Sequence, residues 1–142
     1  MPHILIDYTA NLEAAVTQGR LVDAVHQAAL DCGVFPVWGV RTLARRVDQY
    51  RVGNGDAGNG FVHISVRIAP GRNVELRHRV THELFAAVQR VMGPLFERQR
   101  LGCQIDLSEF EAATTTYCNN LSNQPDPSTP TDESLIGRTP AA

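Results

Sequence analysis

Apolar and polar side chains alternate at two places in the chain, residues 3–8 and residues 61–68. A period of two residues is typical of a β-strand that is buried on one face only. Less regular apolar runs at about 45–52 and 103–110 predict two further strands. The pattern therefore predicts a sheet with two strongly amphipathic strands and two weaker ones.

Two longer stretches repeat apolar residues every three or four positions, which predicts helices packed on a sheet. The first runs from about Glu13 to Asp31 and is followed by Cys32-Gly33, with glycine in its usual place after a helix. The second runs from about Val74 to Arg90 or slightly beyond, with Asn73 as its N-cap. Residues 34–41 form a short apolar crossing between the first helix and the next strand.

The two halves of the chain resemble each other at an offset of sixty residues, so that His3-Ile4 corresponds to His63-Ile64. This predicts an α+β fold in which a duplicated β-α-β unit forms one four-stranded sheet with two helices on one face. The other face of that sheet would be left without cover within the chain. We therefore expect the protein to be an oligomer.

A glycine-rich segment, residues 53–60, contains the spacing G-x-G-x-x-G. A dinucleotide-binding fingerprint must open a helix, whereas this segment precedes the strand at 61–68. We interpret it as a hairpin connection and not as a cofactor site.

Length and composition fit one globular domain followed by a tail. The chain has 142 residues, of which 43% are hydrophobic and 20% charged. We assign residues 1–119 to the folded domain. Residues 120–142 are rich in proline and polar side chains, and we expect them to be disordered.

Charge and hydropathy exclude several classes of partner. A net charge of -2 argues against a general nucleic-acid binder, which would be strongly basic. No apolar run approaches the ~20 residues of a membrane helix, and the N-terminal stretch lacks the features of a secretory signal. The three cysteines share no metal-type spacing, so we expect reduced thiols in a cytoplasmic protein.

Pro2 is the first candidate for chemistry, because removal of Met1 would leave a secondary amine at the head of the first strand. An α-amino group titrates near ~8, and burial or nearby cations lower that value, which would make the amine a general base near neutral pH. Met-Pro is also simply how some chains begin. The hypothesis that this amine is catalytic therefore needs support from other residues of the chain.

Other polar pairs are weaker candidates. His78 and His82 are four residues apart on the second helix, but no third ligand stands at a telling distance, so no metal site is expected. His3 and His63 occupy equivalent strand starts, where a structural role is the first interpretation and a role of His63 in the site is the second.

Three groups of residues together resemble the 5-carboxymethyl-2-hydroxymuconate Δ-isomerase family of the tautomerase superfamily. They are the N-terminal Met-Pro-His-Ile-Leu-Ile, the segment Gly-Val-Phe-Pro-Val-Trp-Gly-Val-Arg at 33–41, and Phe-Val-His at 61–63 followed by Ala-Pro-Gly-Arg at 69–72. The resemblance runs from Pro2 to about Leu107 and excludes the tail.

The resemblance implies a homotrimer and an isomerase of aromatic catabolism that uses no metal or organic cofactor. It implies that Pro2 moves a proton between carbons of an unsaturated 2-hydroxy or 2-oxo di- or tricarboxylate. It also implies that Arg41 and Arg72 bind this small anionic substrate. Guanidinium groups bind carboxylates through paired hydrogen bonds, and two of them near an amine would lower its pKa.

One position departs from the family. Family members carry a histidine four residues after the middle arginine, where this chain has Arg45. Arg45 is therefore a further candidate for substrate binding, and the substrate could differ. Two alternatives stay open: another oxo acid, as in phenylpyruvate-type tautomerases or decarboxylases of the superfamily, or a non-catalytic binding protein if Met1 is retained.

Overall fold

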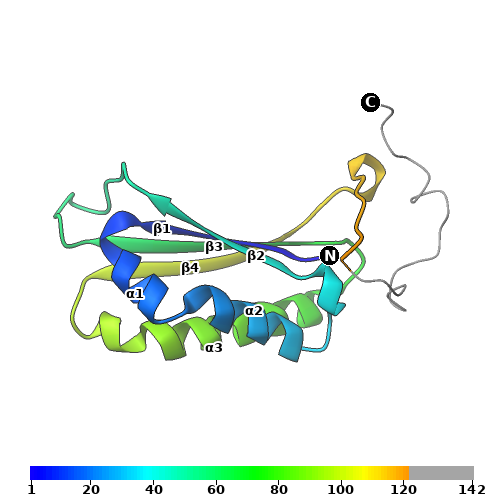
Figure 1. Ribbon diagram of the computed structural model, residues 1–142, viewed down its shortest axis with the longest axis horizontal. Helices are drawn as coiled ribbons and strands as arrows, with labels where there is room; N and C mark the ends of the chain where they lie inside the picture. Colours follow the sequence, from blue (N-terminus) through cyan, green and yellow to red (C-terminus); the bar gives the residue numbers. More distant parts are fainter. Residues whose placement is uncertain (122–142) are drawn as a thin grey trace.

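The computed structural model of the protein describes residues 1–121, and its elements follow the order of two β-α-β units (Figure 1). The strands are β1 (His3–Thr9), β2 (Arg41–Val47), β3 (Gly60–Ile68) and β4 (Leu101–Glu109). The helices are α1 (Glu13–Gln18), α2 (Leu21–Asp31) and α3 (Val74–Phe96), with 3₁₀ turns η1 (Ala10–Leu12), η2 (Val37–Gly39) and η3 (Ala112–Thr114). Apart from Asn120 and Leu121, the predicted tail lies outside the described residues.

The sheet has four strands in the order β2-β1-β3-β4. The central pair, β1 and β3, is antiparallel, and each outer strand is parallel to its neighbour. Leu5 lies opposite Ser65, and the pairs on either side follow the same symmetric register. This register relates the two halves by an offset of sixty residues, so the predicted duplicated β-α-β fold is confirmed.

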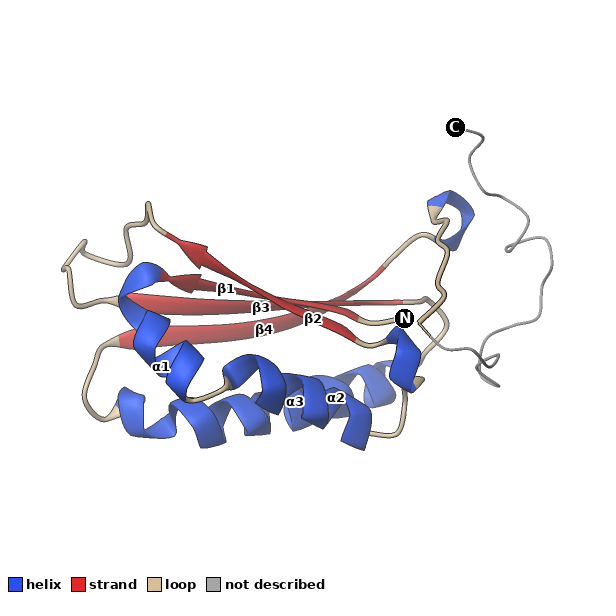
Figure 2. Cartoon of the chain, viewed as in Figure 1, coloured by secondary structure: helices blue, strands red, loops and turns tan. Residues whose placement is uncertain are grey.

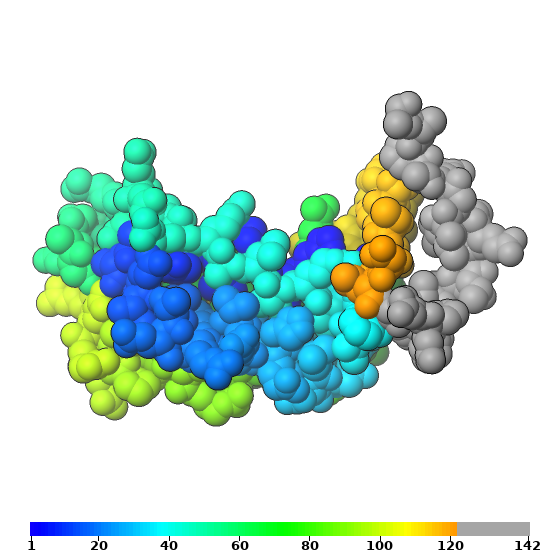
Figure 3. Space-filling view, in the orientation of Figure 1, coloured from blue at the N-terminus to red at the C-terminus, as the bar shows by residue number. Residues whose placement is uncertain are grey.

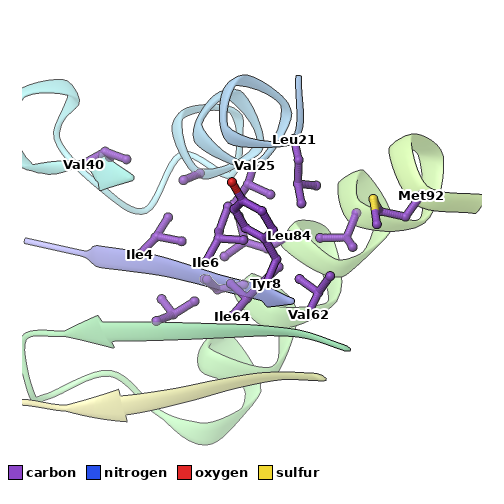
Figure 4. Close-up of a cluster of buried hydrophobic side chains, with 14 of the residues drawn as sticks. Ile4, Ile6, Tyr8, Leu21, Val25, Val40, Val62, Ile64, Leu84 and Met92 are labelled. Atoms are coloured by element: carbon purple, nitrogen blue, oxygen red, sulfur yellow. The ribbon is translucent and has the colours of Figure 1, made fainter. Parts of the chain in front are cut away.

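The helices α1, α2 and α3 cover one face of the sheet, as predicted (Figure 2). Alternate residues of the central strands point into that layer, and α2 and α3 supply the facing apolar side chains (Figure 4). The fully buried core includes Ile4, Ile6, Val62, Ile64, Leu21, Val25, Val80, Leu84 and Met92. Each such side chain contributes about 1.5–3 kcal/mol when it leaves water, so this layer holds the sheet in place.

The first predicted helix, 13–31, is wrong in one respect, because it is broken into α1 and α2. A side chain at Gly19 would lie 2.5 Å from the carbonyl oxygen of Ala15 and 2.8 Å from Val91. Arg20 then adopts a left-handed backbone with φ of 54°. The close approach of α1 to α3 therefore requires a break that the apolar spacing does not reveal.

The second predicted strand, 45–52, is also misplaced, because β2 covers Arg41–Val47. This strand lies at the edge of the sheet, and most of its side chains are exposed. An edge strand has a neighbouring strand on one side only, and its two faces are poorly covered by other elements. Its side chains therefore need not alternate between apolar and polar types. The second predicted helix, in contrast, is confirmed and extends to Phe96.

The face of the sheet away from the helices is open in the single chain. Leu43 of β2 is 64% exposed there, and its partner in the register is Leu5 of β1. None of the helices within residues 1–121 is both long and apolar enough to span a membrane.

Candidate active site at the start of the central strand

The N-terminus lies at the start of β1, beside the start of β2. Pro2 is buried, and its carbonyl oxygen accepts a hydrogen bond from the backbone N–H of Arg41 at 3.1 Å. The parallel register continues this contact, with His3 opposite Arg41. The sheet itself therefore brings the N-terminus and Arg41 together.

The side chain of Arg41 stays at the same end of the sheet. Its Nη1 donates to the carbonyl oxygen of Gly39 at 3.2 Å and lies 3.3 Å from the thioether sulfur of Met1. A side chain on Gly39 would come within 3.4 Å of Met1 and 3.0 Å of Pro36. Glycine at this position therefore allows η2 to approach the N-terminus closely.

Arg72 reaches the same region from the turn between β3 and α3. Its guanidinium lies 5.4 Å from the centre of the Phe35 ring, a cation–π arrangement, and its Nη1 donates to the carbonyl oxygen of Ala69 at 3.4 Å. Neither Arg41 nor Arg72 forms an ion pair within residues 1–121. Both guanidinium groups are thus available to an anionic ligand.

These two guanidinium groups act electrostatically on the α-amino group of the chain. Burial at the end of the sheet, followed by the positive charges of Arg72 and Arg41, lowers its pKa below the ordinary value. In the chain as described, this amine belongs to Met1. Removal of Met1 would transfer it to Pro2, one residue nearer to the core.

The other two candidate residues lie further along the sheet. Arg45 forms a two-pronged ion pair with Asp7, at 2.8 and 3.2 Å, and His63 contacts Asp106 at 2.6 Å. Asp7 is the register partner of both Arg45 and His63, and Asp106 lies diagonally to them, two residues beyond Gln104, the β4 partner of His63. The four residues form one polar row across the open face. This row is four residues from the His3–Arg41 pair, about 13 Å at about 3.3 Å per residue.

His3 lies between these groups and the amine. It has Arg41 and Arg67 as register partners, and burial, Arg41, the N-terminus and Arg67 together lower its pKa. A histidine that stays neutral here adds no positive charge to a site that already holds two arginines.

Some residues near the site carried no role in the sequence analysis. Phe35 was part of the resemblance, but only the fold shows that its ring lies under Arg72. Glu109, at the end of β4, contacts the turn that carries Arg72, and no sequence signal indicates this contact because it depends on the β3–β4 register. Within residues 1–121 no group of three or more histidine, cysteine, aspartate or glutamate residues could hold a metal ion.

One family of known proteins matches most of this chain. The family model described as 5-carboxymethyl-2-hydroxymuconate isomerase matches residues 2–124. The chain belongs to this family. It is therefore an isomerase, of the tautomerase superfamily.

Individual relatives support the assignment. A 5-carboxymethyl-2-hydroxymuconate Delta-isomerase of Escherichia coli is 24% identical over 121 residues, which cover 85% of this chain and 96% of that protein. The crystal structure of a 5-carboxymethyl-2-hydroxymuconate isomerase from Deinococcus radiodurans R1 is 29% identical, with a TM-score of 0.78 over 84% of this chain and 90% of that one. A fused 4-OT protein described as a symmetric trimer shares the fold at 18% identity, with a TM-score of 0.65 over 96% of this chain and 99% of that one.

Proposed function

We propose that this isomerase moves a proton within an unsaturated 2-hydroxy or 2-oxo di- or tricarboxylate of the 5-carboxymethyl-2-hydroxymuconate type, in the breakdown of aromatic compounds. The base is the secondary amine of Pro2, exposed by removal of Met1. The observation that carries the proposal is the α-amino group, half-buried at the end of β1 with a lowered pKa and flanked by Arg41 and Arg72.

The chemistry needs one base and a place for negative charge. The nitrogen of Pro2 takes the proton of the 2-hydroxyl group of the dienol, so the C–O bond becomes a carbonyl and the electron pair moves through the conjugated system to the far carbon of the diene. The same nitrogen, now protonated, gives the proton to that carbon. The product is the conjugated keto isomer, with the same atoms as the substrate, and no other reactant takes part.

The two arginines supply the electrostatic support. A planar guanidinium binds a carboxylate through paired hydrogen bonds. One of the two can bind a substrate carboxylate while the other stabilises the negative oxygen that develops during proton transfer. Their positive charges also lower the pKa of the N-terminal amine, which favours the unprotonated state that a base requires.

The assembly that we propose is a homotrimer in which the open faces of three sheets surround a threefold axis. The exposed Leu43 beside Leu5 and the polar row through Asp7 would then be covered by other copies. Closed rotational symmetry is the usual arrangement of such assemblies. The related fold of the fused 4-OT trimer supports this number of subunits.

A second form of the chain deserves a test, because Met1 contacts Arg41 in the structure. If Met1 is retained, the nitrogen of Pro2 is an amide and has no lone pair for catalysis. Such a form would be a non-catalytic binding protein. The mass of the purified chain distinguishes the two forms directly.

The deciding experiment compares the processed protein with a version that carries an N-terminal extension. The conversion of a 2-hydroxymuconate-type dienol is followed by its ultraviolet absorbance. We expect the processed protein to turn over and the extended one to be inactive, with both remaining trimers. Pro2→Ala, which keeps a primary amine, should retain a small part of kcat. Equal rates of the processed and extended proteins would exclude Pro2 as the base.

A further inference from the structure

The carboxylate of Glu109 ties together the parts of the chain that meet beside Arg72. Glu109 is the last residue of β4, and its register partner Ile68 is the last residue of β3. Its Oε2 accepts a hydrogen bond from the backbone N–H of Gly71 at 3.2 Å, and its Oε1 lies 3.2 Å from Nη1 of Arg77. One side chain therefore connects the end of the sheet, the 69–72 turn and the first part of α3.

The turn needs such a tether. Gly71 has φ of 110°, a conformation that only glycine adopts without strain, and a side chain there would meet no atom within 4 Å. The position of a side chain at Gly71 thus faces open space directly before Arg72. A hydrogen bond to the N–H of Gly71 fixes the backbone one residue from the arginine that the proposed reaction uses.

Arg77 in turn fixes the carboxylate of Glu109. The backbone N–H of Arg77 donates to the carbonyl oxygen of Asn73 in the first turn of α3, so its side chain starts from a rigid element. The side chains of Arg77 and Glu109 are only 35% and 28% exposed, and Arg77 is the least exposed of the arginines that form ion pairs within residues 1–121. A negative charge near the start of a helix is also favourable.

We propose that Glu109 is the positioning residue for Arg72: its carboxylate holds the 69–72 turn against the end of the sheet, so that the guanidinium of Arg72 stays beside the N-terminal amine and over the ring of Phe35. Arg77 supports Glu109 in this role. This role of Glu109 rests on the proposed function, in which Arg72 is one of the two cations at the site.

A merely structural role would predict only a loss of stability, so the test needs a readout at the amine. The positive charge of Arg72 is one of the causes that lower the pKa of that amine. If the turn moves, Arg72 moves with it, and the amine then holds its proton up to a higher pH. The titration can be followed without turnover, by ¹⁵N NMR of the Pro2 nitrogen in the processed trimer.

The experiment compares Glu109→Ala and Glu109→Gln with the wild-type protein and with Glu83→Ala. Glu83 pairs with Arg79 at 3.1 Å on α3, the helix that also carries Arg77, so Glu83→Ala is the matched control. We expect Glu109→Ala to move the titration of the amine, and the acid limb of kcat/KM, upward by about half a pH unit. We also expect it to lower kcat/KM by about tenfold, since small misplacements of a catalytic group are costly. Glu109→Gln, whose amide oxygen can still accept from Gly71, should recover most of both, and Glu83→Ala should change neither.

Arg72→Ala separates this inference from the proposed function. If Glu109 acts by positioning Arg72, the double variant Arg72→Ala/Glu109→Ala has the same amine titration and the same kcat/KM as Arg72→Ala alone. A wild-type titration and wild-type kcat/KM for Glu109→Ala, together with an impaired Arg72→Ala, would overturn the positioning role and leave the proposed function intact. Wild-type kinetics for Arg72→Ala would count against the proposed function, while the NMR titration would still report on positioning. If Glu109→Ala does not fold, Arg77→Met is used, and an amine titration unchanged from wild type would overturn the inference.

Discussion

At the residue scale, four arginines near the sheet fall into two groups. Arg45 and Arg46 are paired with the carboxylates of Asp7 and Glu13, whereas Arg41 and Arg72 donate to backbone carbonyl oxygens. A guanidinium bonded to a carbonyl keeps its full charge and several donors for a ligand. The first pair is therefore occupied by carboxylates of the chain, and the second pair is suited to an anionic substrate.

Replacement of Arg41 or Arg72 by alanine should weaken catalysis strongly. Each variant loses a charged donor near the amine, and we expect a loss of about 2–4 kcal/mol of transition-state stabilisation. Steady-state kinetics should show the loss mainly in KM for the arginine that binds a remote carboxylate and mainly in kcat for the other.

Arg45→Ala provides the matched control for these two variants. Its side chain is occupied by Asp7, and it lies in a different row of the sheet. We expect kcat/KM within about twofold of wild type, which is the size of effect usual away from a site. A loss equal to that of Arg41→Ala would show that Arg45 takes part in substrate binding after all.

The pH dependence of activity should report the amine. Because burial and the two arginines lower its pKa, the amine is already unprotonated at pH values where an ordinary α-amino group is charged. The value of kcat/KM should therefore be constant at high pH and fall about tenfold per pH unit only below a midpoint under ~8. In Arg72→Ala the midpoint should move to higher pH, and an unchanged midpoint would mean that the amine is not the titrating base.

At the scale of single elements, the success of sequence analysis follows burial. β1 and β3 are the central strands, each with one buried face, so their alternation is strong and their positions were predicted within a residue or two. β2 is exposed at the edge, so its pattern was misplaced. The break between α1 and α2 follows Gly19, where a side chain would lie 2.8 Å from Val91, and the spacing of apolar residues does not reveal this distant neighbour.

The break offers a test of backbone strain. Arg20 is the one residue other than glycine with a positive φ within residues 1–121, and a left-handed conformation costs such a residue about 1–2 kcal/mol. Arg20→Gly should relieve this cost and raise the free energy of unfolding by about 0.5–1 kcal/mol. Thermal unfolding would then show a Tm higher by about 2–6 °C. Arg20→Ala keeps the strain and loses only the exposed pair with Asp23, so its Tm should not rise.

At the scale of the whole molecule, the sheet divides the protein into a packed side and an open side. The helices cover one face, while the other carries Leu5 and Leu43 beside the polar row of Arg45, Asp7, His63 and Asp106. The segment after β4 stands beside η2 (Figure 3), where Asn119 donates to the carbonyl oxygen of Trp38 at 3.4 Å. The open face therefore borders the N-terminal site along one end.

The proposed trimer predicts a mass of about 47 kDa in solution, from chains of 15.6 kDa. Leu43→Glu places a charge on the open face at its β2 edge, and we expect it to shift the population to monomers, as read by light scattering. Phe96→Glu changes an exposed apolar residue of α3 in the helical layer and should leave the trimer intact. A monomeric wild-type protein would rule out the packing of sheets around an axis.

The symmetric pairing of β1 with β3 has a consequence for how many bases one chain can hold. The two halves present equivalent strand starts at opposite ends of the sheet, but only the first can supply the proposed base. At the second start, the counterpart of Pro2 is Val62, an internal residue of β3, and the N–H of Phe61 before it is bonded to the hydroxyl of Thr9. Duplication has thus doubled the scaffold without doubling the proposed base. A reagent that alkylates the reactive amine should saturate at one equivalent per polypeptide, and a circular permutant that joins the original ends would keep the architecture while losing its base.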